Sequence, residues 1–198
     1  MSDFDSSAVS LRAAEKSDCR TIAALYRISS DGVADYIWSK LAEPGEDLLD
    51  VGRRRYEREE SVFSYRNCTV AVLEGEVLGM LIAFPMRVDE KAGEEESDPV
   101  LAPYGKLEED NSYYICGVAL FPPYRGHGLG SRFLELAENQ ARERKLPKLS
   151  LIVFEQNAGA RRLYERRGYL EVAREPVVPH PLIQHTGDAL LMVKRVRD

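Results

Sequence analysis

Residues Tyr113 to Gly130 read YYICGVALFPPYRGHGLG, and the chain continues directly with SRFLELA. A run of aromatic and β-branched residues reaches the turn Pro122-Pro123, then glycines at every second position, then apolar residues at helical spacing. The order of these segments predicts a strand, a glycine loop and an amphipathic helix.

The glycine loop predicts a binding site for a phosphate or pyrophosphate group. Gly126, Gly128 and Gly130 leave a backbone with few Cβ atoms, which can turn so that several N–H groups converge on the start of the helix. The positive end of the helix dipole and the unpaired amides of the first turn favour an anion at the same place.

Two widespread phosphate-binding motifs do not fit this loop. A P-loop ends in Gly-Lys-Ser/Thr, whereas this loop ends in Gly130-Ser131-Arg132. A dinucleotide fingerprint that begins at Gly126 requires a small residue such as glycine where Ser131 stands, and one that begins at Gly128 meets Phe133.

Arg125, Gly128 and Gly130 instead match the pattern Arg/Gln-x-x-Gly-x-Gly/Ala of the GCN5-related N-acetyltransferases. The preceding Val118-Ala119-Leu120-x-Pro122-x-Tyr124 and the later Asn157-x-x-Ala160-x-x-Leu163-Tyr164-x-x-x-Gly168-Tyr169 resemble the same superfamily in order and distance. The resemblance is specific from Tyr113 to Tyr169 and weak before residue 65. It implies an α/β (α+β) fold with a mixed, mostly antiparallel central sheet flanked by helices.

The resemblance implies acetyl-coenzyme A (acetyl-CoA) as cosubstrate, and no metal. Its pyrophosphate would occupy the glycine loop, and its pantetheine arm would pair with free backbone groups near Val118 and Leu120, as a short added strand would. Asn157 would cap its helix and touch the same arm. The expected cofactor-binding residues are Val118, Leu120, Arg125, Gly126, His127, Gly128, Leu129, Gly130, Ser131, Asn157, Ala160 and Tyr164.

Leu120 and Tyr164 are the expected catalytic residues. Acyl transfer develops negative charge on the carbonyl oxygen, and the Leu120 amide stands where the family places the donor to it. Tyr164 stands at the family's general-acid position, where a phenol protonates the departing thiolate. A core tyrosine with a satisfied hydroxyl is the alternative for Tyr164, since Ala160 and Leu163 share its helical face.

A general base for the attacking amine is not identified. Many relatives carry a glutamate near the position of Cys116 or Gly117, and this chain has none there, so Cys116 is interpreted as a small buried apolar residue. The remaining acidic, phenolic and imidazole candidates are Glu108, Glu109, Asp110, Tyr113 and His185. Tyr36 and Trp38 are candidate acceptor contacts, although core packing is the commoner fate of aromatic residues at helical spacing.

Composition places the chain among ordinary globular domains. Its 198 residues are 44% hydrophobic and 30% charged, and no linker divides them, which predicts a single N-acetyltransferase domain over 1–198 with a frayed segment at 1–8. The net charge of -6 argues against nucleic acid as a partner. Three cysteines without metal-ligand spacing and no membrane-spanning apolar run predict a cytoplasmic protein.

The other segments complete the expected fold. Short strands are predicted at 9–12, at 67–73 with 77–84 as a hairpin ended by Pro85, and at 149–154 as a buried parallel strand, with a closing antiparallel pair at 169–175 and 189–196. Helices are predicted after Ser17 or Asp18, around 34–41, and over 47–60. Residues 89–110 are predicted to form an acidic surface loop, with a lid that attracts a protonated amine as the sharper alternative.

The predicted function is transfer of an acetyl group from acetyl-CoA to a primary amine by direct attack. A non-catalytic acyl-coenzyme A binding module is the alternative, and a site for another nucleotide is a third hypothesis. The acceptor, a small-molecule or peptide amine, is not identified by the sequence. Any homodimer is expected to form through the terminal strands.

Overall fold

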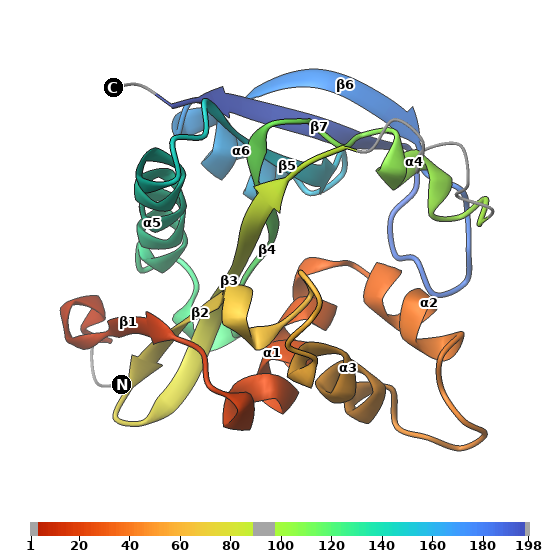
Figure 1. Cartoon of the computed structure of the whole chain (residues 1–198), viewed down its shortest axis with the longest axis horizontal. Helices are drawn as coiled ribbons and strands as arrows, with labels where there is room; N and C mark the ends of the chain where they lie inside the picture. Colours follow the sequence, from red (N-terminus) through yellow and green to blue (C-terminus); the bar gives the residue numbers. More distant parts are fainter. Residues whose placement is uncertain (1–3, 89–97, 197–198) are drawn as a thin grey trace. The chain divides into compact units, whose positions relative to one another are not determined.

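The computed structural model describes residues 4–88 and 98–196. Its strands form a seven-stranded sheet in the order β1-β2-β3-β4-β5-β7-β6 (Figure 1). The main elements are β1 (Ser10–Ala13), α1 (Cys19–Ser29), α2 (Val33–Ser39), α3 (Leu48–Glu57), β2 (Cys68–Leu73), β3 (Glu76–Met86), α4 (Ala102–Gly105), β4 (Ser112–Leu120), α5 (Leu129–Glu143), β5 (Lys148–Phe154), α6 (Ala158–Arg166), β6 (Leu170–Pro176) and β7 (Asp188–Arg195). The mostly antiparallel sheet and flanking helices confirm the predicted fold class.

The chain forms two compact units. Unit 1 comprises Met1–Ala83 with Gly117–Phe133, and unit 2 comprises Phe84–Cys116 with Leu134–Asp198. Because β3, β4 and α5 each pass from one unit to the other, this division does not test the prediction of a single domain.

The N-terminal strands of unit 1 form the predicted antiparallel hairpin. β1 pairs with β2 from Ser10 opposite Val72 onward, and β2 pairs with β3. The turn between β2 and β3 contains Glu74 at φ 51° and Gly75 at φ 86°, and two left-handed residues match the twist of a two-residue hairpin. The prediction that Pro85 ends β3 was wrong, because the strand continues to Met86 with Pro85 on its exposed side, where no ladder donor is needed.

Helices α1, α2 and α3 pack together in unit 1 around Trp38 (Figure 1). Trp38 is 1% exposed, and a Cβ added at Gly52 would lie 2.7 Å from its ring, so α3 needs a glycine there to approach it. Tyr36 is also buried, with its hydroxyl accepting a hydrogen bond from Lys40 at 3.2 Å. Core packing is therefore confirmed for both aromatic residues.

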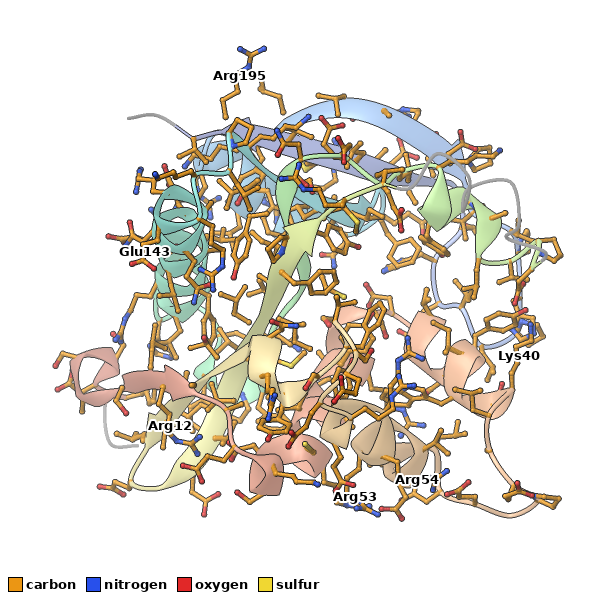
Figure 2. The ribbon with its side chains drawn as sticks, in the orientation of Figure 1. Arg12, Lys40, Arg53, Arg54, Glu143 and Arg195 are labelled. Carbon is orange, nitrogen blue, oxygen red and sulfur yellow. The ribbon has the colours of Figure 1, made fainter. Side chains whose placement is uncertain are left out.

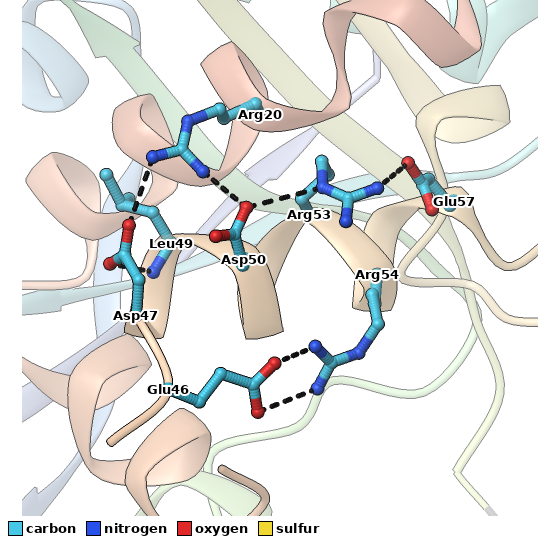
Figure 3. Close-up of polar contacts among 8 residues, drawn as sticks. All are labelled: Arg20, Glu46, Asp47, Leu49, Asp50, Arg53, Arg54 and Glu57. Carbon is cyan, nitrogen blue, oxygen red and sulfur yellow. Dashed lines mark hydrogen bonds and ion pairs between the residues drawn. The ribbon is translucent and has the colours of Figure 1, made fainter. Parts of the chain in front are cut away.

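A network of ion pairs joins the surfaces of α1 and α3. Arg20 on α1 donates to Asp47, which caps α3, at 3.0 Å, and to Asp50 one turn later (Figure 3). The side chains of Arg53 and Arg54 point outward from α3 (Figure 2), where they pair with Glu57 and Glu46. Such exposed pairs add little to the stability of the fold, which rests on the buried core beneath them.

Unit 2 is organised around β5, which has a parallel and an antiparallel neighbour. β4 pairs with it in parallel from Tyr113 opposite Leu149, and β7 pairs with it antiparallel along its whole length. The hydroxyls of Ser112 and Ser150 are 2.7 Å apart in the core, so the two buried polar groups satisfy each other. The predicted buried parallel strand and the closing pair β6–β7 are both confirmed.

The segment predicted as an acidic loop is only partly described, since residues 89–97 lie outside the described range. Its second half is more ordered than predicted, because Val100 and Leu107 are buried on either side of the one-turn helix α4. Glu109 pairs with Lys148, and the Asp110 carboxylate accepts from the Val88 amide at 3.0 Å. The alternative of an acidic lid stays a prediction.

Within the described ranges, the structure contains no helix that is long and apolar enough to cross a membrane. Cys19, Cys68 and Cys116 all lie in the described ranges and form no disulfide; the first two are buried and Cys116 is half-buried.

Candidate functional site

The turn that follows β4 is held by its own backbone and by Arg125. The amide of Phe121 donates to the carbonyl oxygen of Leu78 at 2.9 Å, and residues Pro122–Tyr124 form a single 3-10 turn. The Arg125 Nε–H then donates to the Leu120 carbonyl oxygen at 3.1 Å. A guanidinium has five N–H donors, so this bond orients Arg125 and leaves its terminal nitrogens available to an anion.

The glycine loop has the backbone that the sequence predicts. Gly126 and Gly128 both have φ 83°, in the left-handed region where other residues are strained. A Cβ at either position would meet nothing within 4 Å, so the loop needs glycine for its backbone angles and not for space. His127 stands between them with its ring exposed.

Helix α5 begins where the loop ends. The Arg132 amide donates to the Gly128 carbonyl oxygen at 3.1 Å, which makes this the first hydrogen bond of the helix. The amides of Leu129, Gly130 and Ser131 precede it and have no acceptor inside the helix. Leu129 has a fully buried side chain that anchors this end of the helix. Three backbone donors and the positive end of a 15-residue helix thus meet at the loop.

Leu120 lies against Gly79 of β3. A Cβ at Gly79 would be 2.4 Å from the Leu120 Cδ2 atom and 2.6 Å from the Ala119 carbonyl oxygen. The absence of a side chain at Gly79 therefore sets how closely the end of β4 approaches β3. Val118, two residues earlier, is half-buried, as is Leu120.

The space beside Gly117 is tight. A Cβ at Gly117 would lie 3.0 Å from the Ser29 hydroxyl and 3.3 Å from the Tyr26 ring of α1. A larger residue at this position would therefore need the Ser29 and Tyr26 side chains to move by a few tenths of an ångström.

In unit 2, α6 is capped at both ends, and Asn157 provides the predicted N-terminal cap. The Asn157 side-chain oxygen accepts from the Ala160 amide at 3.2 Å, and Gly168 follows the helix at φ 86°. Between them Tyr164 is half-buried, with its ring 5.9 Å from the ring of Tyr169. Its partial exposure differs from that of Tyr169, which is fully buried.

Tyr114 is a candidate site residue that the sequence analysis missed. Burial raises the pKa of its phenol well above the usual value, and the charges of Cys116, Glu108 and Tyr164 raise it further. The two-residue repeat of a strand could have found it, since Tyr114 shares a face of β4 with Cys116 and, further along, Val118 and Leu120.

Most of the candidate bases have other partners. Glu109 pairs with Lys148, and the hydrogen bond from the Val88 amide lowers the pKa of Asp110. The Tyr113 hydroxyl donates to the Gln140 side-chain oxygen at 2.9 Å, and the His185 Nδ1 atom lies 3.4 Å from the Gln156 side-chain oxygen. The charge of Glu108 contributes to the raised pKa of Tyr114.

Comparisons with known proteins identify a family for the chain. A family model described as the acetyltransferase (GNAT) family matches residues 33–169. The uncharacterized N-acetyltransferase YycN of Bacillus subtilis is 41% identical over 58 residues, which are 29% of this chain and 37% of that protein. N-alpha-acetyltransferase 40 of Saccharomyces cerevisiae is 36% identical over 80 residues, 37% of this chain and 28% of that protein.

A solved structure extends the likeness to nearly the whole fold. The structure of yncA from Salmonella typhimurium with its cofactor acetyl-CoA has a TM-score of 0.63 at 20% identity, and the match covers 96% of this chain and 95% of that one. The chain spans only about a third of the length of the curated relatives it matches.

Proposed function

The chain belongs to the acetyltransferase (GNAT) family, and on that premise we propose that it transfers an acetyl group from acetyl-CoA to a primary amine. The observation that carries the proposal is the combination of left-handed Gly126 and Gly128 with the three amides at the start of α5 that have no acceptor inside the helix. The acetyl-CoA complex of the structural neighbour yncA supports the choice of cosubstrate.

The residues of unit 1 would hold the pyrophosphate and stabilise charge. Arg125 is oriented by its bond to the Leu120 carbonyl, and it adds a cationic fork to the amides of Leu129, Gly130 and Ser131. The Leu120 amide would donate to the negative charge that develops on the acyl oxygen. Acetyl-CoA supplies an activated thioester when bound.

Tyr164 of unit 2 would supply the proton that the thiolate takes up. Tyr164 is half-buried and so partly accessible, as a proton donor to a bound molecule requires. A phenol of pKa about 10 can protonate a thiolate whose acid has a pKa of about 8.5 only with local assistance. Asn157 and Ala160, at the start of the same helix, would contact the pantetheine arm.

An acyl-coenzyme A binding module without turnover is the second candidate. The sequence at Cys116-Gly117 favours it, because a carboxylate base is absent where many relatives carry one. Under the first proposal the amine instead arrives neutral or loses its proton through water.

Thiol release from acetyl-CoA, measured with a panel of primary amines, separates the two candidates. Tight binding of acetyl-CoA without thiol release for any amine would favour the module. In an active protein, Tyr164→Phe should lower kcat by about 100-fold or more and leave the Kd of acetyl-CoA unchanged. Tyr65→Phe is the matched control, because that hydroxyl bonds to Glu59 on the exposed surface. Equal kcat in the two variants would remove Tyr164 from its role.

A further inference from the structure

The N-terminal segment packs against the glycine loop within unit 1. The ring of Phe4 meets the ring of His127 edge to face, with centroids 4.7 Å apart, and the ring of Tyr124 at 5.3 Å. His127 is the only side chain between Gly126 and Gly128, and Tyr124 belongs to the turn before them. A single aromatic residue therefore contacts the loop on both sides of its first left-handed glycine.

A second, independent contact joins the same segment to the first turn of α5. The two terminal nitrogens of Arg132 donate to the carbonyl oxygens of Ser6 and Val9, each at 2.9 Å. The segment is itself ordered, because Asp5 accepts from the Ser7 amide at 2.9 Å and begins a 3-10 turn over Ser6–Ala8. Val9, which ends it, is 2% exposed.

We propose that residues 4–9 act as a brace that preorganises the phosphate-binding loop, and that Phe4 and Arg132 are positioning residues for the bound cofactor. The inference rests on the proposed function, since it takes acetyl-CoA as the ligand of that loop. Neither residue need touch the cofactor.

The physical reason is the flexibility of the loop. Two glycines in the left-handed region belong to a segment whose unbound backbone can adopt many conformations, and binding a pyrophosphate must fix one of them. A contact that restricts His127 before the ligand arrives reduces that entropic loss. Aromatic pairs of this geometry are strong enough to matter for affinity without being required for folding.

The geometry of Arg132 allows two roles to be distinguished by experiment. One is to hold the N-terminal segment by hydrogen bonds, and the other is to attract an anion by its charge alone. Its guanidinium forms a fork that reaches two carbonyl oxygens at once, whereas a lysine has a compact ammonium with the same charge. Arg132→Lys therefore keeps the positive charge near the loop and loses the fork. If Arg132 acted only through its charge, that substitution would leave the affinity unchanged.

The test measures the Kd of acetyl-CoA by calorimetry and kcat at saturating acetyl-CoA in the full chain. We expect Phe4→Ala and Arg132→Lys each to raise Kd about 3- to 10-fold while kcat stays within about twofold of the unsubstituted protein. Phe63→Ala is the matched control within unit 1, because the Phe63 ring packs against Arg55, whose guanidinium carbon lies 4.5 Å from the ring centroid. Phe4→Tyr should restore most of the affinity, since it keeps the ring contact.

A second measurement does not depend on the ligand. In the ligand-free protein, Phe4→Ala should shift the NMR resonances of the His127 ring and speed amide hydrogen exchange at Gly128. Unchanged resonances and exchange, or an unchanged Kd in Phe4→Ala, would overturn the brace. If the unsubstituted protein did not bind acetyl-CoA while these resonances moved, the loop would be braced but the proposed function would fail.

Discussion

Gly79 offers a direct test of how the end of β4 is positioned. In Gly79→Ala, the new methyl group would lie 2.6 Å from the Ala119 carbonyl oxygen, against ordinary contacts of 3.4 Å or more. Leu120 can rotate its Cδ2 atom away, but the Ala119 oxygen belongs to the backbone. The backbone of β4 must therefore move by about 0.8 Å beside the Leu120 amide.

The expected effect on stability is the difference between two terms. Overpacking of this kind costs about 1–3 kcal/mol, whereas replacing a strand glycine by alanine gains about 0.5–1 kcal/mol. We expect a net loss of about 1–2 kcal/mol in the free energy of unfolding, measured by urea denaturation, because the clash is with backbone. If the Leu120 amide stabilises the developing charge, a shift of this size should also lower kcat at least about tenfold.

Gly105→Ala provides the control for Gly79→Ala. The same methyl group at Gly105 meets nothing within 4 Å, so the free energy of unfolding should stay the same or rise slightly. A Gly79→Ala protein as stable and active as the unsubstituted one would refute the packing argument. A less stable protein with full kcat would refute the role of Leu120.

Two further predictions concern titratable groups. Burial would raise the pKa of Asp18, but hydrogen bonds from Arg12 and the Glu15 amide outweigh it, so the pKa is lowered in the folded protein. The ionised carboxylate should stabilise the fold above the unfolded pKa of about 3.9, and this stabilisation should be lost as the pH falls through the folded pKa. In Asp18→Asn the free energy of unfolding, measured by urea denaturation, should therefore fall less steeply at acid pH than in the unsubstituted protein. The same pH dependence in both proteins would contradict this. Burial, with Glu57 and Asp18 nearby, raises the pKa of Cys19 to about 11. A thiol reagent at about pH 8 should therefore modify half-buried Cys116 before Cys19, as detected by mass spectrometry. Modification of Cys19 before Cys116 would contradict this prediction.

The features that could be predicted from sequence are those decided by local backbone chemistry. The left-handed glycines of the loop, the Asn157 cap and Gly168 after α6 follow from preferences that act within a few residues. The strands around the hairpin and β5 follow from apolar patterning over short windows. These local preferences are kept in the folded structure because no contact with a distant segment opposes them.

The features that were missed depend on contacts between distant segments. The α4 turn exists because Val100 and Leu107 are buried, although the surrounding composition is that of a loop. Tyr114 was overlooked because the raised pKa of its phenol comes mainly from burial, which folding produces. The contact of Phe4 with His127 joins residues more than a hundred positions apart.

The sequence by itself determined the glycine loop, the helix that follows it and the family to which the chain belongs, because glycine content, caps and motif spacing are properties of neighbouring residues. Only the tertiary structure decided that the Ser29 hydroxyl and the Tyr26 ring lie close beside Gly117. It also decided that the N-terminal segment packs on the loop. Both features are contacts between residues that are far apart in the sequence, and such contacts are set by close packing in the folded protein.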